Sequence, residues 1–159
     1  MTTRTKIVSE ALRHVGKKEV GNNRGTFVER LLARVGLGGG YPWCAAFVSS
    51  VLQDAGVKAG PKIGRAAVRN WEKWAHQNGR LIKIDQVKPG DLFFWINPNG
   101  TGHIGIVEAI KWSQATHTTM IYTIEGNTNS SGSREGDGVY RKTRLPSAKI
   151  QFIRSTNEP

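Results

Sequence analysis

The sequence predicts an α+β fold, in which N-terminal helices pack on a C-terminal antiparallel sheet of about five strands. Apolar residues recur at helical spacing in the first half of the chain, and short apolar runs between turn signals follow in the second half. We see no linker and no internal repeat in the 159 residues, of which 38% are hydrophobic. We therefore expect a single domain over residues 1–159 with a substantial buried core.

Four helices are expected in the first half. They cover residues 5–15, 25–35, 44–55 and 64–76. In the first of them the helical spacing is carried by Ile7, Val8, Ala11, Leu12 and Val15. Each segment is followed by a glycine: Gly16, Gly36, Gly56 and Gly79. Glycine suits the left-handed conformation with which many helices end, so these positions are the predicted helix ends.

Five strands are expected in the second half. They cover residues 92–96, 103–110, 119–125, 138–145 and 149–154. Turn signals rich in Pro, Gly and Asn precede the first two strands, at residues 88–91 and 97–100. Helices that come first and strands that come afterwards are typical of an α+β fold, with helices on one side of an antiparallel sheet.

The chain is strongly basic, with 23 Lys and Arg against 12 Asp and Glu and a net charge of +11. This favours polyanionic partners, such as nucleic acid, anionic lipid headgroups or an acidic wall polymer. The positive charges are spread along the chain and no nucleic-acid recognition module is visible, so we expect no specific nucleic-acid binding.

The lengths of the apolar segments indicate where in the cell the protein is made and acts. None approaches the roughly 20 residues of a membrane-spanning helix, and the N-terminus lacks the apolar core of a secretory signal. We therefore expect a protein that is made in the cytoplasm and acts on the cell wall or in the periplasm only after release.

Cys44 is the only cysteine, which excludes an intramolecular disulfide and a multi-cysteine zinc site. It lies at the first turn of the third predicted helix. There the helix dipole and the unpaired N–H groups stabilise a thiolate, as a nucleophile requires. A free cysteine can also be a buried packing residue, and its position alone leaves both interpretations open.

A thiol nucleophile needs a base, and His103 is the best candidate among four histidines. It stands at the start of a predicted strand between Gly102 and Gly105, where small neighbours permit close approach to the imidazole. The other three suit structural roles at two helix ends and in a hairpin turn: His14, His76 and His117.

Glu125 and Asn127 are the candidates for orienting this base. Residues two apart on a strand face the same side, so both side chains are expected to point toward the imidazole, and either can accept a hydrogen bond from its ring N–H. The alternative is a polar strand end that leads into a loop. The histidines are scattered and form no close ligand pair with Cys44, so no metal site is predicted.

Four segments together resemble the CHAP domain, named for cysteine, histidine-dependent amidohydrolase/peptidase activity. In the family's order they are Pro42–Val48 (PWCAAFV), Lys88–Leu92 (KPGDL), Gly102–Val107 (GHIGIV) and Thr123–Thr128 (TIEGNT). The resemblance extends from about residue 19 to residue 140. The family is papain-like and related to the NlpC/P60 peptidases, so the resemblance implies a papain-like CHAP fold and a single CHAP-type catalytic domain.

The resemblance implies a role for each candidate residue. Cys44 would be the nucleophile, His103 the general base, Glu125 the group that orients the imidazole and Asn127 a further polar member of the site. Three more residues would contact substrate or shape the cleft: Trp43, Glu19 and Asn23. Trp43, as a large aromatic residue, equally suits the core.

The resemblance also implies the activity. We expect a monomeric, cysteine-dependent peptidoglycan hydrolase that acts either as an N-acetylmuramoyl-L-alanine amidase or as a peptide endopeptidase. A single-domain phage endolysin is the expected setting, and the cationic surface would bind the anionic cell envelope. The alternatives are an amidase effector toxin and a non-catalytic wall-binding or virion module.

No cofactor is expected. Some CHAP endolysins bind calcium in an aspartate-rich loop before the cysteine, whereas residues 36–40 here, Gly-Leu-Gly-Gly-Gly, offer no carboxylate to a hard cation. The loop departs from those members of the family, and we therefore predict no calcium site in it.

Overall fold

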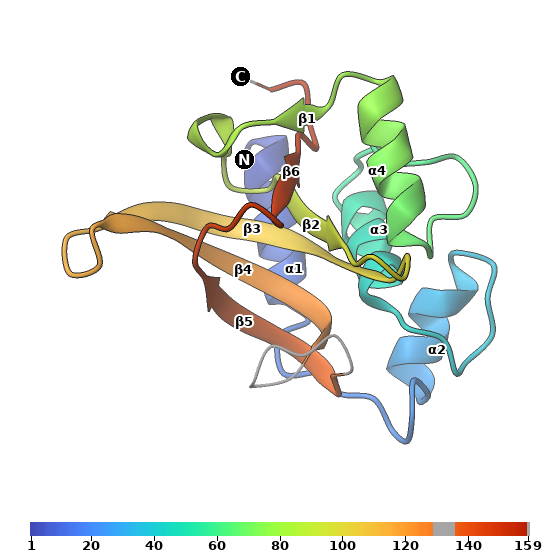
Figure 1. Ribbon diagram of the computed structural model, residues 1–159. Coiled ribbons are helices and arrows are strands. Elements are labelled where there is room, and N and C mark those ends of the chain that lie inside the picture. Colours follow the sequence, from blue (N-terminus) through green and yellow to red (C-terminus); the bar gives the residue numbers. More distant parts are fainter. Residues whose placement is uncertain (129–135, 159) are drawn as a thin grey trace.

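The protein is described by a computed structural model for residues 1–128 and 136–158. In these residues four helices pack with a six-stranded antiparallel sheet, and the α+β fold predicted from the sequence is confirmed (Figure 1). The helices are α1 (Thr3–Leu12), α2 (Thr26–Ala33), α3 (Cys44–Asp54) and α4 (Val68–Gln77). Helix α4 begins at Val68 rather than at Gly64, because Gly64 has a φ of 67° and Ala67 is extended.

The strand order in the sheet is β1-β6-β2-β3-β4-β5. The strands are β1 (Leu81–Ile82), β2 (Leu92–Ile96), β3 (Gly102–Ser113), β4 (Thr118–Thr128), β5 (Gly138–Arg144) and β6 (Gln151–Ile153). The sequence predicts all of these except β1. Strand β1 has two residues, which pair with Ile153 and Phe152 of β6, and two residues are too few to show a strand period.

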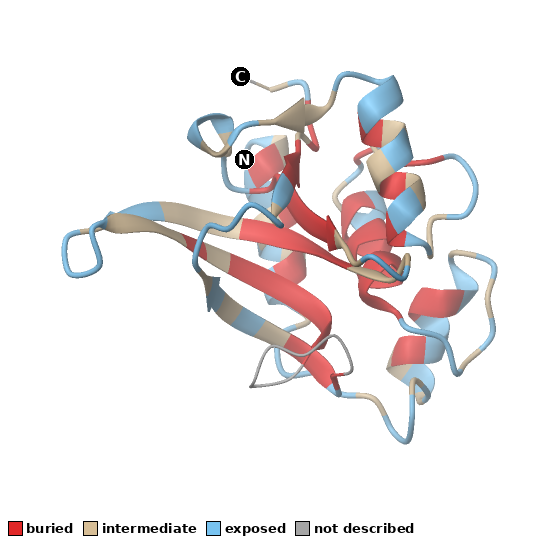
Figure 2. Ribbon diagram, viewed as in Figure 1, coloured by how far each residue is buried: buried red, intermediate tan, exposed pale blue. Residues whose placement is uncertain are grey.

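Strand β2 lies inside the sheet and is buried on both of its faces (Figure 2). Leu92 and Phe94 belong to the main core with the helices, whereas Phe93 and Trp95 point to the opposite face. There they form a second group, called here the outer cluster: Phe93, Trp95, Val107, Ile121 and Phe152. Burial on both faces explains why β2 is an unbroken apolar run.

The two longest strands, β3 and β4, form a hairpin that projects from the body of the molecule (Figure 1). The tip is exposed: Trp112 is 60% exposed, and His117 lies in the turn with a φ of 49°. The opposite end is buried (Figure 2). It contains the start of β3 and the end of β4, so the hairpin brings His103 and Glu125 side by side inside the protein.

A buried ion pair joins the two chain ends to the start of β2. Arg4 Nη1 lies 2.7 Å from Asp91 Oδ1, and Asp91 is fully buried. The same carboxylate accepts hydrogen bonds from the backbone N–H groups of Ser155 and Lys88. Because both carboxylate oxygens of Asp91 are engaged, the pair fixes α1 and the C-terminal segment against the sheet.

Within the described residues, no helix is both long and apolar enough to cross a membrane.

Candidate active site

Cys44 is the first residue of α3, as the sequence predicts, and is 5% exposed. Trp43 occupies the N-cap position and makes no side-chain hydrogen bond to the helix. The N–H groups of the first turn have no partner within the helix, so they remain available to an anion at this end. The thiol therefore lies where negative charge is stabilised.

His103 lies on β3, is 1% exposed, and has its two ring nitrogens in different surroundings. Nε2 lies 2.7 Å from Glu125 Oε2. Nδ1 is buried and has no hydrogen-bond partner among residues 1–128 and 136–158. This nitrogen is therefore available to interact with the thiol of Cys44. The ring packs against Trp95 of the outer cluster, with 5.0 Å between centroids, so its orientation is fixed from both sides.

Glu125, on β4, is completely buried and all of its oxygen atoms are engaged. Oε1 accepts hydrogen bonds from the Thr123 hydroxyl and from Arg144 Nε, and Oε2 accepts from His103 and from Arg144 Nη2. Both contacts with Arg144 measure 2.6 Å. A Cβ atom at Gly105 would lie 2.5 Å from Phe93 Cε1 and 3.1 Å from Glu125 Cγ, so glycine makes room for both of these side chains. The geometry makes Glu125 the partner of the imidazole.

The pKa values of these groups follow from the contacts. Burial by itself raises the pKa of the Cys44 thiol, but the His103 imidazole and the backbone N–H groups of Ile104 and Ala45 outweigh it and lower that pKa. Burial lowers the pKa of His103, whereas its interactions with Cys44 and Glu125 raise it to about 9. Together these shifts favour the thiolate–imidazolium pair over the neutral thiol and imidazole.

The same reasoning applies to the carboxylate. Burial raises the pKa of Glu125, but Arg144 and then His103 reverse this and lower it to about 2. The charges thus alternate in the order Arg144, Glu125, His103 and Cys44, and they sum to zero in a largely buried site.

Arg144 is the member of this group that the sequence does not indicate. It lies at the end of β5, where it pairs with Ile121 of β4, and its guanidinium also stacks on Trp95 at 4.8 Å from the ring centroid. Nothing local distinguishes it from the other basic residues. It would have been found only from the register between β4 and β5, combined with the alternation that places it on the face of Glu125.

Asn127 does not join the imidazole. A register irregularity lies between Glu125 and Thr128, and Asn127 has a φ of 54°, so the expected alternation along β4 is interrupted. Asn127 is 3% exposed and lines a hollow beside the nucleophile together with Glu19 and Asn23. The structure therefore brings Glu125 to His103 and Asn127 to the predicted cleft residues.

The expected contact of Trp43 with substrate is wrong. Trp43 is fully buried, lies edge-on to Phe27 with 5.9 Å between ring centroids, and donates from Nε1 to Glu19 Oε2 at 3.0 Å. A side chain of this size with no exposed surface cannot contact substrate, so Trp43 is a core residue. Through its indole N–H it positions Glu19.

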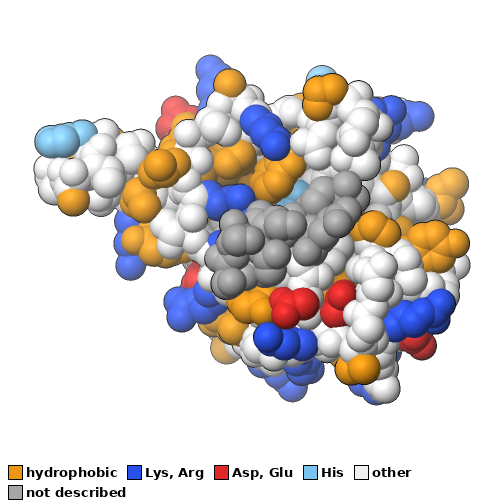
Figure 3. Space-filling model, turned by 60° about the horizontal axis from the view of Figure 1, so that its bottom comes forward, with side chains coloured by type: hydrophobic (Ala, Val, Ile, Leu, Met, Phe, Trp, Pro, Cys, Tyr) orange, Lys and Arg blue, Asp and Glu red, His pale blue; other side chains and the backbone are white. Residues whose placement is uncertain are grey.

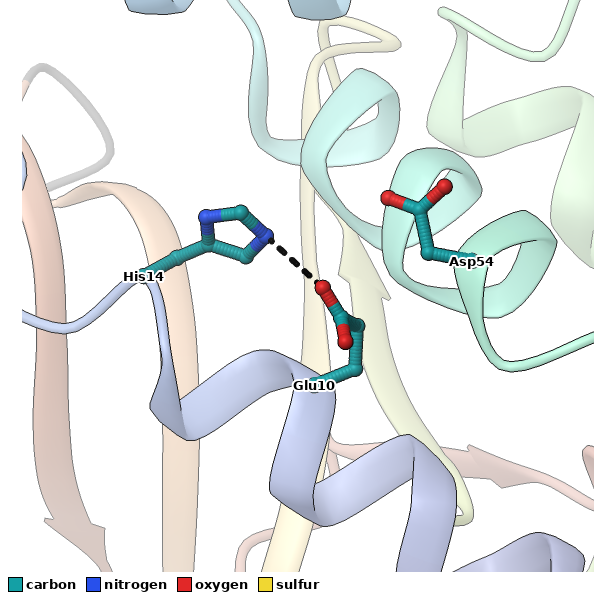
Figure 4. Close-up of side chains that lie close together, drawn as sticks. All are labelled: Glu10, His14 and Asp54. Carbon is teal, nitrogen blue, oxygen red and sulfur yellow. Dashed lines mark ion pairs between the residues drawn. The ribbon is translucent and has the colours of Figure 1, made fainter.

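One group of possible metal ligands occurs among the described residues, at the junction of α1 and α3 (Figure 4). Glu10, His14 and Asp54 offer ligand atoms within 4.8 Å of one another. Arg34, however, donates to both oxygens of Asp54, and Arg13 donates to Glu10. A cation would have to displace these arginines, so the arrangement suits an ion-pair network better than a metal site. The absence of a metal stays a prediction.

The basic residues on one face of the molecule are spread out. Lys and Arg side chains occur around the whole face shown in Figure 3 and do not gather in one patch. Binding of an anionic envelope polymer through this charge therefore stays a prediction.

Comparisons with known proteins agree with the motifs. The CHAP domain family model matches residues 36–127, which include Cys44, His103, Glu125 and Asn127. No curated protein matches the chain. A similar solved structure is RipD from Mycobacterium tuberculosis, described as a non-catalytic NlpC/p60 domain protein with an adaptation to peptidoglycan-binding function. It is 14% identical, with a TM-score of 0.57 over 98% of this chain and 99% of that one, so the likeness concerns the fold. Because the family model covers more than half of the sequence, the protein belongs to the CHAP domain family, a family of peptidoglycan-related hydrolases.

Proposed function

We propose that the protein hydrolyses an amide bond of peptidoglycan by covalent thiol catalysis. The observation that carries the proposal is the buried series Cys44, His103 and Glu125, in which Glu125 orients the imidazole of His103 and that imidazole stabilises the thiolate of Cys44. A nucleophile, a base and a group that orients the base are the parts that such a reaction needs.

The reaction follows from these contacts. The Cys44 thiolate attacks the amide carbonyl, and N–H groups of the first turn of α3 stabilise the oxyanion. The His103 imidazolium gives its Nδ1 proton to the leaving amine, which breaks the C–N bond and leaves a thioester on Cys44. His103, now neutral, takes a proton from water, and the resulting hydroxide attacks the thioester and releases the acid and the thiolate. Glu125 keeps the ring in one orientation throughout.

A second candidate is a non-catalytic peptidoglycan-binding module, which the description of RipD suggests. The lowered pKa of the Cys44 thiol favours catalysis, because a cysteine that only packs in a core has no stabilised thiolate. A binding module predicts adhesion to the wall without the release of fragments.

The cleaved bond is read from the products. Purified peptidoglycan is incubated with the protein, and the fragments are identified by mass spectrometry. We expect free N-terminal L-alanine for an amidase, or a new peptide terminus within the stem or cross-bridge for an endopeptidase. Because Cys44 is the only cysteine, protein treated with iodoacetamide is a matched control that should release nothing. Fragment release by the alkylated protein would contradict the mechanism, and no release by the untreated protein would favour the binding module.

The biological setting belongs to the same proposal. We take it to be host lysis by a phage endolysin that is made in the cytoplasm and reaches the wall after release, in keeping with the family resemblance of the motifs. An amidase effector toxin would use the same chemistry, and a neighbouring immunity gene would identify it.

A further inference from the structure

We infer that the hollow beside Cys44 binds a cationic amine of the substrate. This inference rests on the proposed function. It specifies that the peptide substrate carries a free ammonium group near the amide bond that is cleaved. The hollow has a volume of about 320 Å³. The side chains that line it are Glu19, Asn22, Asn23, Pro42, Asn127 and Asp137.

Several residues that line the hollow are close in sequence to the proposed catalytic residues. Pro42 stands two positions before Cys44, and Asn127 stands two positions after Glu125. Glu19 is bound to the indole of Trp43, the residue that precedes the nucleophile. A group held here is inferred to belong to the same substrate molecule whose amide lies at the thiol.

The hollow is built into the fold. The backbone N–H of Glu19 donates to Asp137 at 2.8 Å, which ties this segment to the residue before β5. The N–H of Gly40 donates to the carbonyl of Asn23 at 2.7 Å, which ties it to the loop before Cys44. Asn23 and Asn127 both have positive φ angles, of 55° and 54°. Such strained conformations persist where the surrounding structure enforces them, often at binding sites.

An unused acceptor points to the ligand. Asn127 is 3% exposed, and its Oδ1 atom is buried without a hydrogen-bond partner in the described part of the chain. A buried oxygen that no protein group satisfies costs free energy unless a ligand or water donates to it. The ligand that fits this atom carries N–H or O–H donors.

The charge of the lining selects among such ligands. In a chain of net charge +11, this hollow carries two carboxylates, Glu19 and Asp137. Lys18 and Tyr140 contact Asp137, whereas Glu19 accepts a neutral indole N–H. Among the described residues Glu19 has no cationic side chain as partner, so its carboxylate is available to a cation from outside. In peptidoglycan, the free amines of uncross-linked stem peptides supply an ammonium group, and the glycan–peptide amide itself does not.

The test separates this site from general electrostatic attraction. Purified sacculi are compared with sacculi whose free amines have been acetylated, and binding of the Cys44→Ala protein is measured by co-sedimentation. Acetylation makes the wall more negative, so a generally cationic surface should bind it more tightly. The inferred site predicts the opposite, a loss of affinity of about tenfold.

Two matched variants complete the test in the same Cys44→Ala background. Glu19→Gln removes the charge but can still accept from Trp43, and it should bind both kinds of sacculi with the same weak affinity. Glu29→Gln makes the same change of charge at an exposed position outside the hollow and should keep the tenfold preference. Equal or tighter binding to acetylated sacculi, a preference that survives Glu19→Gln, or no binding to native sacculi would each overturn the inference.

The two proposals can fail separately. Fragment release by the protein with intact Cys44, together with binding that ignores the amines, would overturn the amine site alone. Amine-dependent binding without any fragment release would overturn hydrolysis and leave the amine site in place.

Discussion

Cys44→Ala is expected to abolish peptidoglycan hydrolysis, and His103→Ala is expected to lower kcat/KM by at least about 10³-fold. Without the sulfur no acyl-enzyme forms. Without the imidazole the thiolate loses the neighbour that lowers its pKa, and the leaving amine loses its proton donor. The measurement is the rate of turbidity loss of purified sacculi, with product amines counted by a colorimetric reagent.

The pH dependence of kcat/KM for the wild-type protein should report the ionisation of the His103 imidazole. The pKa of His103 is raised to about 9, so the ring keeps its proton below that pH and can donate it to the leaving group. We therefore expect kcat/KM to fall as the pH rises through about 9. His117→Ala, at the exposed hairpin turn, is the control and should match the wild type. Lysis at undiminished rates by Cys44→Ala or His103→Ala would contradict the mechanism.

Most of the fold can be predicted from periodicity, because each long element carries its own signal. Helix α3 and strand β2 illustrate this: one begins at Cys44 after a glycine-rich loop, and the other is an apolar run bounded by turns. Strand β1 cannot be predicted in this way. Its two residues are strand only because β6 passes beside them, and that contact joins residues about 70 positions apart.

The residues of the site also differ in how far the sequence alone predicts them. Cys44, His103 and Glu125 can be proposed from the sequence because each stands at a recognisable position of its element and the motifs occur in the family's order. Asn127 shows the limit, since its direction depends on an irregularity in the β4–β5 register that alternation does not reveal. Arg144 shows it more strongly, because its contact with Glu125 depends on the pairing of two strands.

Arg144→Gln is expected to lower the reactivity of Cys44 at neutral pH by about tenfold. The reason lies in the alternating charges. With Arg144 gone, the charge of Glu125 is no longer balanced, and a second negative charge on the nearby thiol becomes harder to form. The pKa of Cys44 should therefore rise. The measurement is the rate of alkylation by iodoacetamide as a function of pH, which reports on the thiolate independently of any substrate.

Strand β5 supplies the matched control for this prediction. Arg141 binds Glu108 through two hydrogen bonds, as Arg144 binds Glu125, but the Arg141 side chain is 61% exposed and that of Arg144 is 17% exposed. Arg141→Gln should leave the alkylation profile unchanged, because water reaches the exposed Arg141 position and compensates for the lost charge.

Two further results are expected at Arg144. Arg144→Gln should reduce the free energy of unfolding by about 3–5 kcal/mol. Arg144→Lys should recover part of the Cys44 reactivity, because it restores the positive charge without the bidentate contact. If Arg144→Gln is folded and its alkylation profile matches the wild type, Arg144 supports the structure of the strand and does not position the charges at Cys44.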